Sequence, residues 1–298
     1  MDSNNWRSIV YGNNFYVAVA QKVSGGTNLT MTSSDGITWT GSPAAYEANS
    51  WNSVSLGNNK YVSVGSGPAG NPRTMSSPDG ITWTGNPSAN DNVNWLSITY
   101  GNNIFVATGT IPFTTGGNRT MTSTDGNTWT GHPSANEANG WYSVIYANNI
   151  FVAVAASGSS NLTMTSPDGI TWTGSPSSND SNSWRSVTYG NNIFVAVAGS
   201  GTNRTMTSPD GVTWTGHPSA SEGITWTSVA FGNDVFVAVG SDGTGVQTMS
   251  SPNGIFWSGH PSANSNAWAS VTYGTNVFVA VAGSGATSNR TMISSNVI

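Results

Sequence analysis

Residues 141–175 read WYSVIYANNIFVAVAASGSSNLTMTSPDGITWTGS, and the rest of the chain repeats this pattern. The stretch consists of short apolar or alternating runs separated by turn residues such as Asn148-Asn149 and Asp168-Gly169. The same order recurs seven times, and its opening tryptophans stand 42 to 46 residues apart: Trp6, Trp51, Trp95, Trp141, Trp184, Trp226 and Trp268. Repeats of this period indicate one supersecondary unit per copy, stacked into a larger array.

Each copy contains four segments with the pattern of strands, which we name A to D. In the fourth copy, residues 141–146 are β-branched and aromatic, and residues 151–155 are apolar on both faces, as between two packed sheets. Residues 162–165 alternate, and in residues 170–173 the alternation predicts Ile170 and Trp172 on one face. No segment has helical periodicity. The sequence therefore predicts one all-β domain over residues 1–298, a seven-bladed β-propeller with four-stranded antiparallel blades.

The seventh copy differs from the others at its end. It continues through residues 289–295 but shows no Asp-Gly-Ile-Thr-Trp-Thr segment for strand D. We therefore expect three strands in blade seven and an exposed sheet edge. Exposed edges pair readily with other chains, so a homo-oligomer contact at blade seven is a further expectation.

The turn between strands C and D carries a recognisable motif. It reads Ser-Pro-Asp-Gly-Ile-Thr-Trp over residues 166–172 and recurs around Asp35, Asp79, Asp125 and Asp210, with Asn253 in the sixth copy. It resembles the Asp-box of the bacterial neuraminidase repeat family, shortened by one residue between Asp and Gly. The resemblance implies a propeller whose Asp-box is a folding element. Each aspartate is expected to accept hydrogen bonds from backbone N–H groups of its own turn.

Composition restricts the classes of function. Only 7% of residues are charged, the net charge is −5, and the eight Lys and Arg form no cluster, so we expect no nucleic-acid partner. No apolar run is long enough to cross a membrane, and no export signal is visible. Cysteine is absent. The sequence leaves the compartment open, although the low charge slightly favours an extracellular or surface-exposed protein.

The candidate binding face is formed by the D–A and B–C loops, which vary in length among the copies. An acid stands four residues before each strand-A tryptophan in six copies, and four copies carry an arginine at the start of strand C. A carboxylate, an arginine and an indole face together would make a sugar-binding pocket. The candidate ligand-binding residues are Glu47, Asp91, Glu137, Asp180, Glu222, Trp51, Trp95, Trp141, Trp184, Trp226, Arg73, Arg119, Arg204, Arg290, His132, His217 and His260. In the alternative interpretation the acids cap the loops and the tryptophans belong to the core.

These observations favour a multivalent carbohydrate-binding module with no cofactor. The three histidines lie one per blade and are not expected to converge on a metal. We also expect no enzyme, because equivalent positions on different blades are not expected to provide the two close, unlike carboxyl groups of a glycosidase. A structural, adhesive or protein-binding propeller is the alternative, including a reconstructed or designed repeat protein without a ligand.

Overall fold

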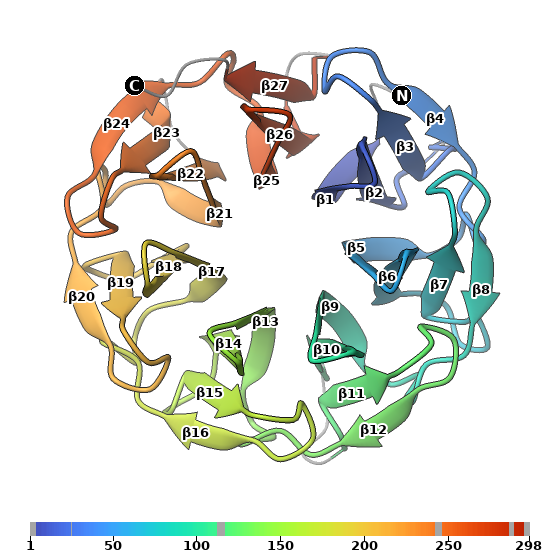
Figure 1. Ribbon diagram of the computed structural model, residues 1–298, viewed down its shortest axis with the longest axis horizontal. Coiled ribbons are helices and arrows are strands. Elements are labelled where there is room, and N and C mark those ends of the chain that lie inside the picture. Colours follow the sequence, from blue (N-terminus) through green and yellow to red (C-terminus); the bar gives the residue numbers. More distant parts are fainter. Residues whose placement is uncertain (1–3, 25, 112–116, 242–245, 286–288, 295–298) are drawn as a thin grey trace.

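The computed structural model describes residues 4–24, 26–111, 117–241, 246–285 and 289–294. Their strands form seven separate sheets around a central opening (Figure 1). Strand A, nearest the opening, is β1 (Asn5–Gly12), β5 (Ser50–Gly57), β9 (Asn94–Gly101), β13 (Gly140–Ala147), β17 (Trp184–Gly190), β21 (Thr225–Gly232) and β25 (Ala267–Gly274). Strand B is β2 (Phe15–Gln21), β6 (Lys60–Ser66), β10 (Ile104–Thr110), β14 (Ile150–Ser157), β18 (Ile193–Ala198), β22 (Val235–Ser241) and β26 (Val277–Ser284).

The two outer strands are short. Strand C is β3 (Thr30–Ser33), β7 (Thr74–Ser77), β11 (Thr120–Ser123), β15 (Thr163–Ser166), β19 (Thr205–Ser208), β23 (Val246–Ser251) and β27 (Thr291–Ser294). Strand D is β4 (Thr40–Ser42), β8 (Thr84–Asn86), β12 (Thr130–His132), β16 (Thr173–Ser175), β20 (Thr215–His217) and β24 (Ser258–Pro261). Six sheets have four antiparallel strands, and the described part of blade seven has three. The predicted seven-bladed propeller, with its incomplete last blade, is confirmed.

The A–B hairpins turn on paired residues with left-handed backbone. Asn148 and Asn149 have φ of 50° and 60°, and the corresponding pairs of the other blades have similar values. Two consecutive positive φ values are those of a type I′ turn, whose twist matches that of the flanking strands. Asparagine tolerates this conformation better than most side chains do, which explains its recurrence.

The Asp-box turn is held by its aspartate. Asp168 Oδ1 accepts hydrogen bonds from the backbone N–H groups of Ile170 and Thr171, each at 2.9 Å. The bond from Thr171, followed by that from Ile170, lowers the pKa of Asp168 below its usual value. One expectation is corrected here. Ile170 belongs to this turn, is 46% exposed and is not a strand residue, because strand D begins only at Thr173.

Neighbouring blades pack through strand B and through the Asp-boxes. Phe151 to Ala155 are fully buried. The Asp-box glycine of each blade lies over the strand-B valine of the preceding blade: a Cβ on Gly169 would come within 2.6 Å of Val106 Cγ2. Near the axis, a strand-A serine accepts a hydrogen bond from the next blade, as Ser186 Oγ does from Val229 N at 3.1 Å. These contacts explain why the residues concerned recur in nearly every copy.

Candidate ligand site at the mouth of the central channel

The loop acids cap the D–A connections. Glu222 Oε1 accepts from the backbone N–H of Ser219 at 2.7 Å, and Asp180 Oδ1 accepts from that of Ser177 at 3.0 Å. Glu47 and Glu137 receive the same kind of bond, from Ala44 and Ser134, and Asp91 accepts from the hydroxyl of Ser88. The acid thus closes a turn three residues long.

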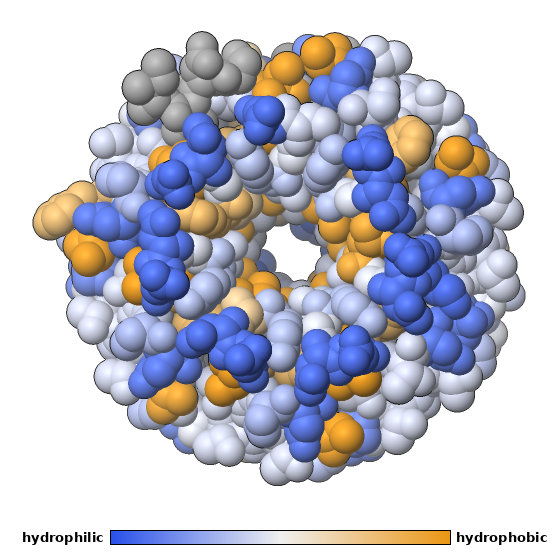
Figure 2. Space-filling model, in the orientation of Figure 1, coloured by the Kyte–Doolittle hydropathy of each residue, from blue (hydrophilic) through white to orange (hydrophobic). Residues whose placement is uncertain are grey.

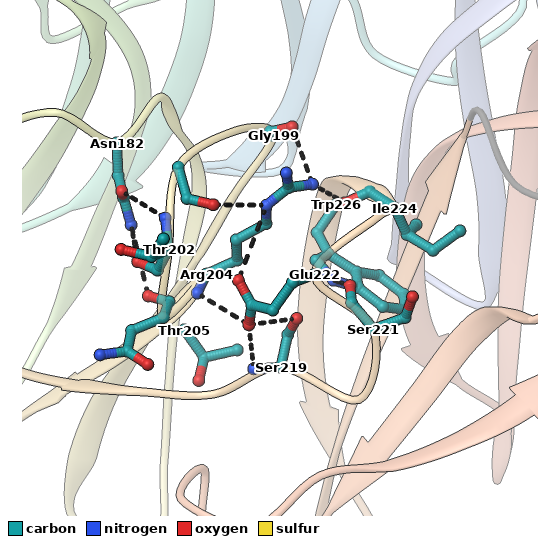
Figure 3. A network of polar contacts seen from close by, with 12 residues as sticks. Asn182, Gly199, Thr202, Arg204, Thr205, Ser219, Ser221, Glu222, Ile224 and Trp226 are labelled. Carbon is teal, nitrogen blue, oxygen red and sulfur yellow. Dashed lines mark hydrogen bonds and ion pairs between the residues drawn. The ribbon is translucent and has the colours of Figure 1, made fainter.

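The repeated arginines bind the backbone of the next loop. Arg204 donates to the carbonyl oxygens of Ile224 and Gly201 at 2.6 and 3.0 Å and pairs with Glu222 at 3.8 Å (Figure 3). Arg73, Arg119 and Arg290 likewise donate to the carbonyls of Val93, Asn139 and Asn4, each at 2.9 Å. These guanidinium groups are largely engaged in holding successive repeats together.

The tryptophans and histidines are also engaged within the fold. The seven strand-A tryptophans are at most 1% exposed, so their indole faces are not accessible to a sugar. The three histidines lie on strand D, and each Nε2 pairs with a hydroxyl on strand C, as His217 does with Thr207 at 2.9 Å. The structure therefore places the predicted site residues in structural contacts, and it does not gather them into one pocket.

The central opening remains when the side chains are drawn, so it is a channel through the ring (Figure 2). A different ring of residues lies beside this channel. In every blade the register of the A–B pair shifts at the residue after the tryptophan, a β-bulge that leaves this residue unpaired. Bulges re-aim side chains. The seven residues at this position, which we call the mouth ring, are Arg7, Asn52, Leu96, Tyr142, Arg185, Thr227 and Ala269. They stand near the start of strand A, at the end of the channel where the D–A and B–C loops lie.

Members of the mouth ring meet across the channel. The Arg185 guanidinium lies over the Tyr142 ring, 5.0 Å from its centroid. Desolvation, and next the charge of Arg185, lowers the pKa of Arg7 from its usual value. Arg7 is in blade one and Arg185 in blade five, and these blades are not neighbours in the ring (Figure 1). The charges of the two arginines therefore interact across the opening.

A chain of side-chain hydrogen bonds runs from Arg7 along the mouth. Arg7 Nη2 donates to Gln21 Oε1 at 2.7 Å, Gln21 Nε2 to Asn52 Oδ1 at 2.8 Å, and Asn52 Nδ2 to the Trp95 carbonyl at 2.8 Å. Arg185 Nε is buried without a hydrogen-bond partner. Among the residues that the structure describes, which exclude Asp2, the ion pairs are Arg119–Glu137 and Arg204–Glu222, and neither involves the mouth ring. The mouth thus combines two guanidinium groups with no described carboxylate partner.

The sequence-based search missed this site, although a signal was present. Strand A is nearly the same in all copies, but the residue after its tryptophan is Arg, Asn, Leu, Tyr, Arg, Thr or Ala. A position that varies within a conserved pattern is free of the packing constraint that fixes its neighbours. The sequence shows that Arg7 and Arg185 share a repeat position, but only the closed ring places this position beside the axis.

No family model and no curated protein sequence matches this chain. Several solved structures have a similar fold. A catalytically inactive virginiamycin B lyase from Staphylococcus aureus with quinupristin has a TM-score of 0.80 at 11% identity, over 95% of this chain and 93% of the other. YCF48 from Cyanidioschyzon merolae has a TM-score of 0.67 at 16% identity over 95% and 94%. The computationally designed protein Ika8 has a TM-score of 0.59 at 15% identity over 94% and 81%.

These comparisons correct the prediction that this chain is not an enzyme. A lyase shares its fold along nearly the whole chain, so the propeller architecture does not exclude catalysis. At 11% identity the likeness shows the fold alone and assigns no reaction. Among the described residues, the structure contains no helix long and apolar enough to span a membrane. The chain has a propeller fold shared with a lyase, YCF48 and a designed protein.

Proposed function

We propose that this propeller binds an acidic saccharide, or another small polyhydroxylated anion, at the mouth ring. The observation that carries the proposal is the stacking of Arg185 on Tyr142 beside the channel, together with the electrostatic interaction of Arg185 with Arg7. Guanidinium groups bind carboxylates and sulfates through charge-assisted hydrogen bonds, and the partially desolvated channel strengthens such bonds. The ligand's anionic group would lie between the two arginines and accept hydrogen bonds from their terminal N–H groups.

The other mouth residues suit the rest of such a ligand. Gln21 and Asn52 carry amides, and Thr227 carries a hydroxyl group, all able to exchange hydrogen bonds with sugar hydroxyls. The Tyr142 ring offers an apolar surface for sugar C–H groups. Carbohydrate binding predicted from the sequence is thus retained, but at one axial site in place of repeated sites in the loops.

Isothermal titration calorimetry with glucuronic acid, glucose and inorganic sulfate tests this proposal. We expect glucuronic acid to bind with a stoichiometry of one, more tightly than either glucose or sulfate. Arg185→Gln and Arg7→Gln should each weaken binding by about tenfold or more, since a hydrogen bond to a charged group contributes about 1.5–3 kcal/mol. Lys60→Gln is the matched control. It removes one positive charge near the A–B turn at the other end of the channel, where Lys60 donates to the Asp125 carbonyl, and it should change nothing.

Two results would contradict the proposal. Affinity that is unchanged in both arginine variants would remove the mouth ring from the site. A stoichiometry of several, lowered by Glu137→Ala and Asp180→Ala, would return the site to the D–A loops. A second candidate function, a propeller that binds protein, is favoured by the open outer edge of blade seven.

A further inference from the structure

A cavity with an apolar floor and a polar rim lies beside blade seven, where the other blades have an outer strand. The cavity measures about 470 Å³ and lies between the outer parts of blades six and seven. Its floor includes Val237, Met249, Phe278, Ala280 and Met292. In Figure 1 β27 is the outermost strand of its sheet, whereas each other sheet continues to a fourth strand.

The six complete blades show what fills this place. In blade four the Asp-box glycine, Gly169, lies against Val106 of the preceding blade. Trp172 donates its indole N–H to the Gly169 carbonyl at 3.1 Å, and its ring centroid lies 6.5 Å from that of Phe151. By repeat equivalence, Val237 and Phe278 are the residues that a seventh Asp-box and a seventh tryptophan would cover.

Exposure at equivalent positions confirms that the cover is missing from the described structure. Val237 is 8% exposed, whereas its six equivalents, Val17, Val62, Val106, Val152, Val195 and Val279, are all 0% exposed. The residues of β27 are all partly or fully exposed, while the corresponding four residues of β3, β7 and β15 are all buried. Ile293 on β27 is 41% exposed. The open edge of blade seven therefore combines an apolar surface with the free edge of β27, whose other edge pairs with β26.

We propose that the open edge of blade seven binds an extended peptide from another protein, with the pattern Asp-Gly-Ile-Thr-Trp-Thr-Gly-Ser. The peptide would pair antiparallel with β27, as β16 pairs with β15, and its tryptophan would enter the cavity. Strand addition of this type takes affinity from main-chain hydrogen bonds and specificity from a side-chain pocket. We specify tryptophan because all six Asp-box segments of this chain carry tryptophan at the equivalent position.

Fluorescence anisotropy of a labelled peptide tests the assignment. The probe is a synthetic peptide with the sequence of residues 166–175, SPDGITWTGS, and the control peptide carries alanine in place of its tryptophan. We expect saturable binding of the probe and at least tenfold weaker binding of the control. Equal binding of the two peptides, or no binding of either, would overturn the proposal.

A variant of the protein provides the matched control. The sequence of residues 208–217, SPDGVTWTGH, is added to the C-terminus, once unchanged and once with its tryptophan replaced by alanine. The unchanged extension should abolish peptide binding, and the alanine form should leave most of it. Binding to both forms alike would place the peptide elsewhere. Sedimentation velocity without peptide shows whether another molecule of this protein occupies the open edge instead. A dimer that persists when the peptide is added would also refute the proposal.

Discussion

Replacement of Asp168 tests whether the Asp-box is a folding element. Its Oδ1 accepts three hydrogen bonds, from Ser166 Oγ, Ile170 N and Thr171 N, each at 2.9 Å. Asp168→Ala removes the single acceptor of all three bonds, but water can reach the released N–H groups of this exposed turn. We therefore expect Asp168→Ala to lower the free energy of unfolding by about 1–2 kcal/mol, as the loss of a helix cap does. For a chain of this size we expect the melting temperature to fall by about 2–4 °C.

Asp168→Asn keeps the hydrogen-bond acceptor and removes the charge. Blade six already carries asparagine at the equivalent position. Asn253 occupies the same position in blade six and accepts from Ile255 N and Phe256 N at 3.0 and 3.2 Å. We therefore expect Asp168→Asn to cost less than half as much as Asp168→Ala at pH 7.

The pH dependence follows from the lowered pKa of Asp168. A carboxylate whose pKa is depressed in the folded state adds stability above its unfolded pKa of about 3.9, and this contribution is lost as the pH falls toward the folded value. The difference in melting temperature between wild type and Asp168→Asn should therefore shrink as the pH falls below about 3.9. Melting curves followed by circular dichroism at pH 7, 4 and 3 measure this difference. If Asp168→Ala melts with the wild type at pH 7 while ligand binding is lost, the structural role is refuted.

Three further predictions concern the repeated contacts. Ser186→Ala leaves the N–H of Val229 without its acceptor and should cost about 1–3 kcal/mol in urea unfolding, and an unchanged midpoint would contradict the inter-blade role. In a double-mutant cycle, Arg204→Ala and Glu222→Ala should show a coupling below about 1 kcal/mol, because their ion pair is long and partly exposed, and a larger coupling would mean that the pair itself joins the blades. Burial lowers the pKa of His132 and His217, so their contribution to stability is lost as the pH falls below the unfolded value of about 6.5. Replacing both with serine, the residue found at Ser175, should flatten the fall in melting temperature between pH 7.5 and 5, and an equally steep fall would contradict this origin.

The sequence allowed the blades, the A–B turns and the incomplete seventh blade to be predicted, because each depends on local patterns. Asparagine pairs determine a hairpin within a few residues, and the absence of an Asp-Gly-Ile-Thr-Trp-Thr segment is visible by comparison with six copies. The exposure of Ile170 could not be predicted from alternation, since the Asp-box keeps three more residues, 170–172, in the turn than the strand pattern suggested. The mouth ring could be recognised only in the closed propeller, where residues from all seven blades come together. Nothing local in the sequence brings Arg7 and Arg185, 178 positions apart in the chain, to opposite sides of one opening.

Two arginines of blade five show the difference between a residue that stabilises the fold and one that is available to bind a ligand. Arg204 stands at a repeated position and donates to the carbonyls of its own and the following loop, so its loss leaves backbone acceptors without a donor. Arg185 stands at the position that differs among copies, contacts Tyr142 across a blade boundary, and keeps Nε without a partner. Selection for folding explains the first and gives no reason for the second. In a ring of near-identical blades, the residues that recur hold the ring closed, and the residues that differ at the axis are the ones to examine for ligand binding.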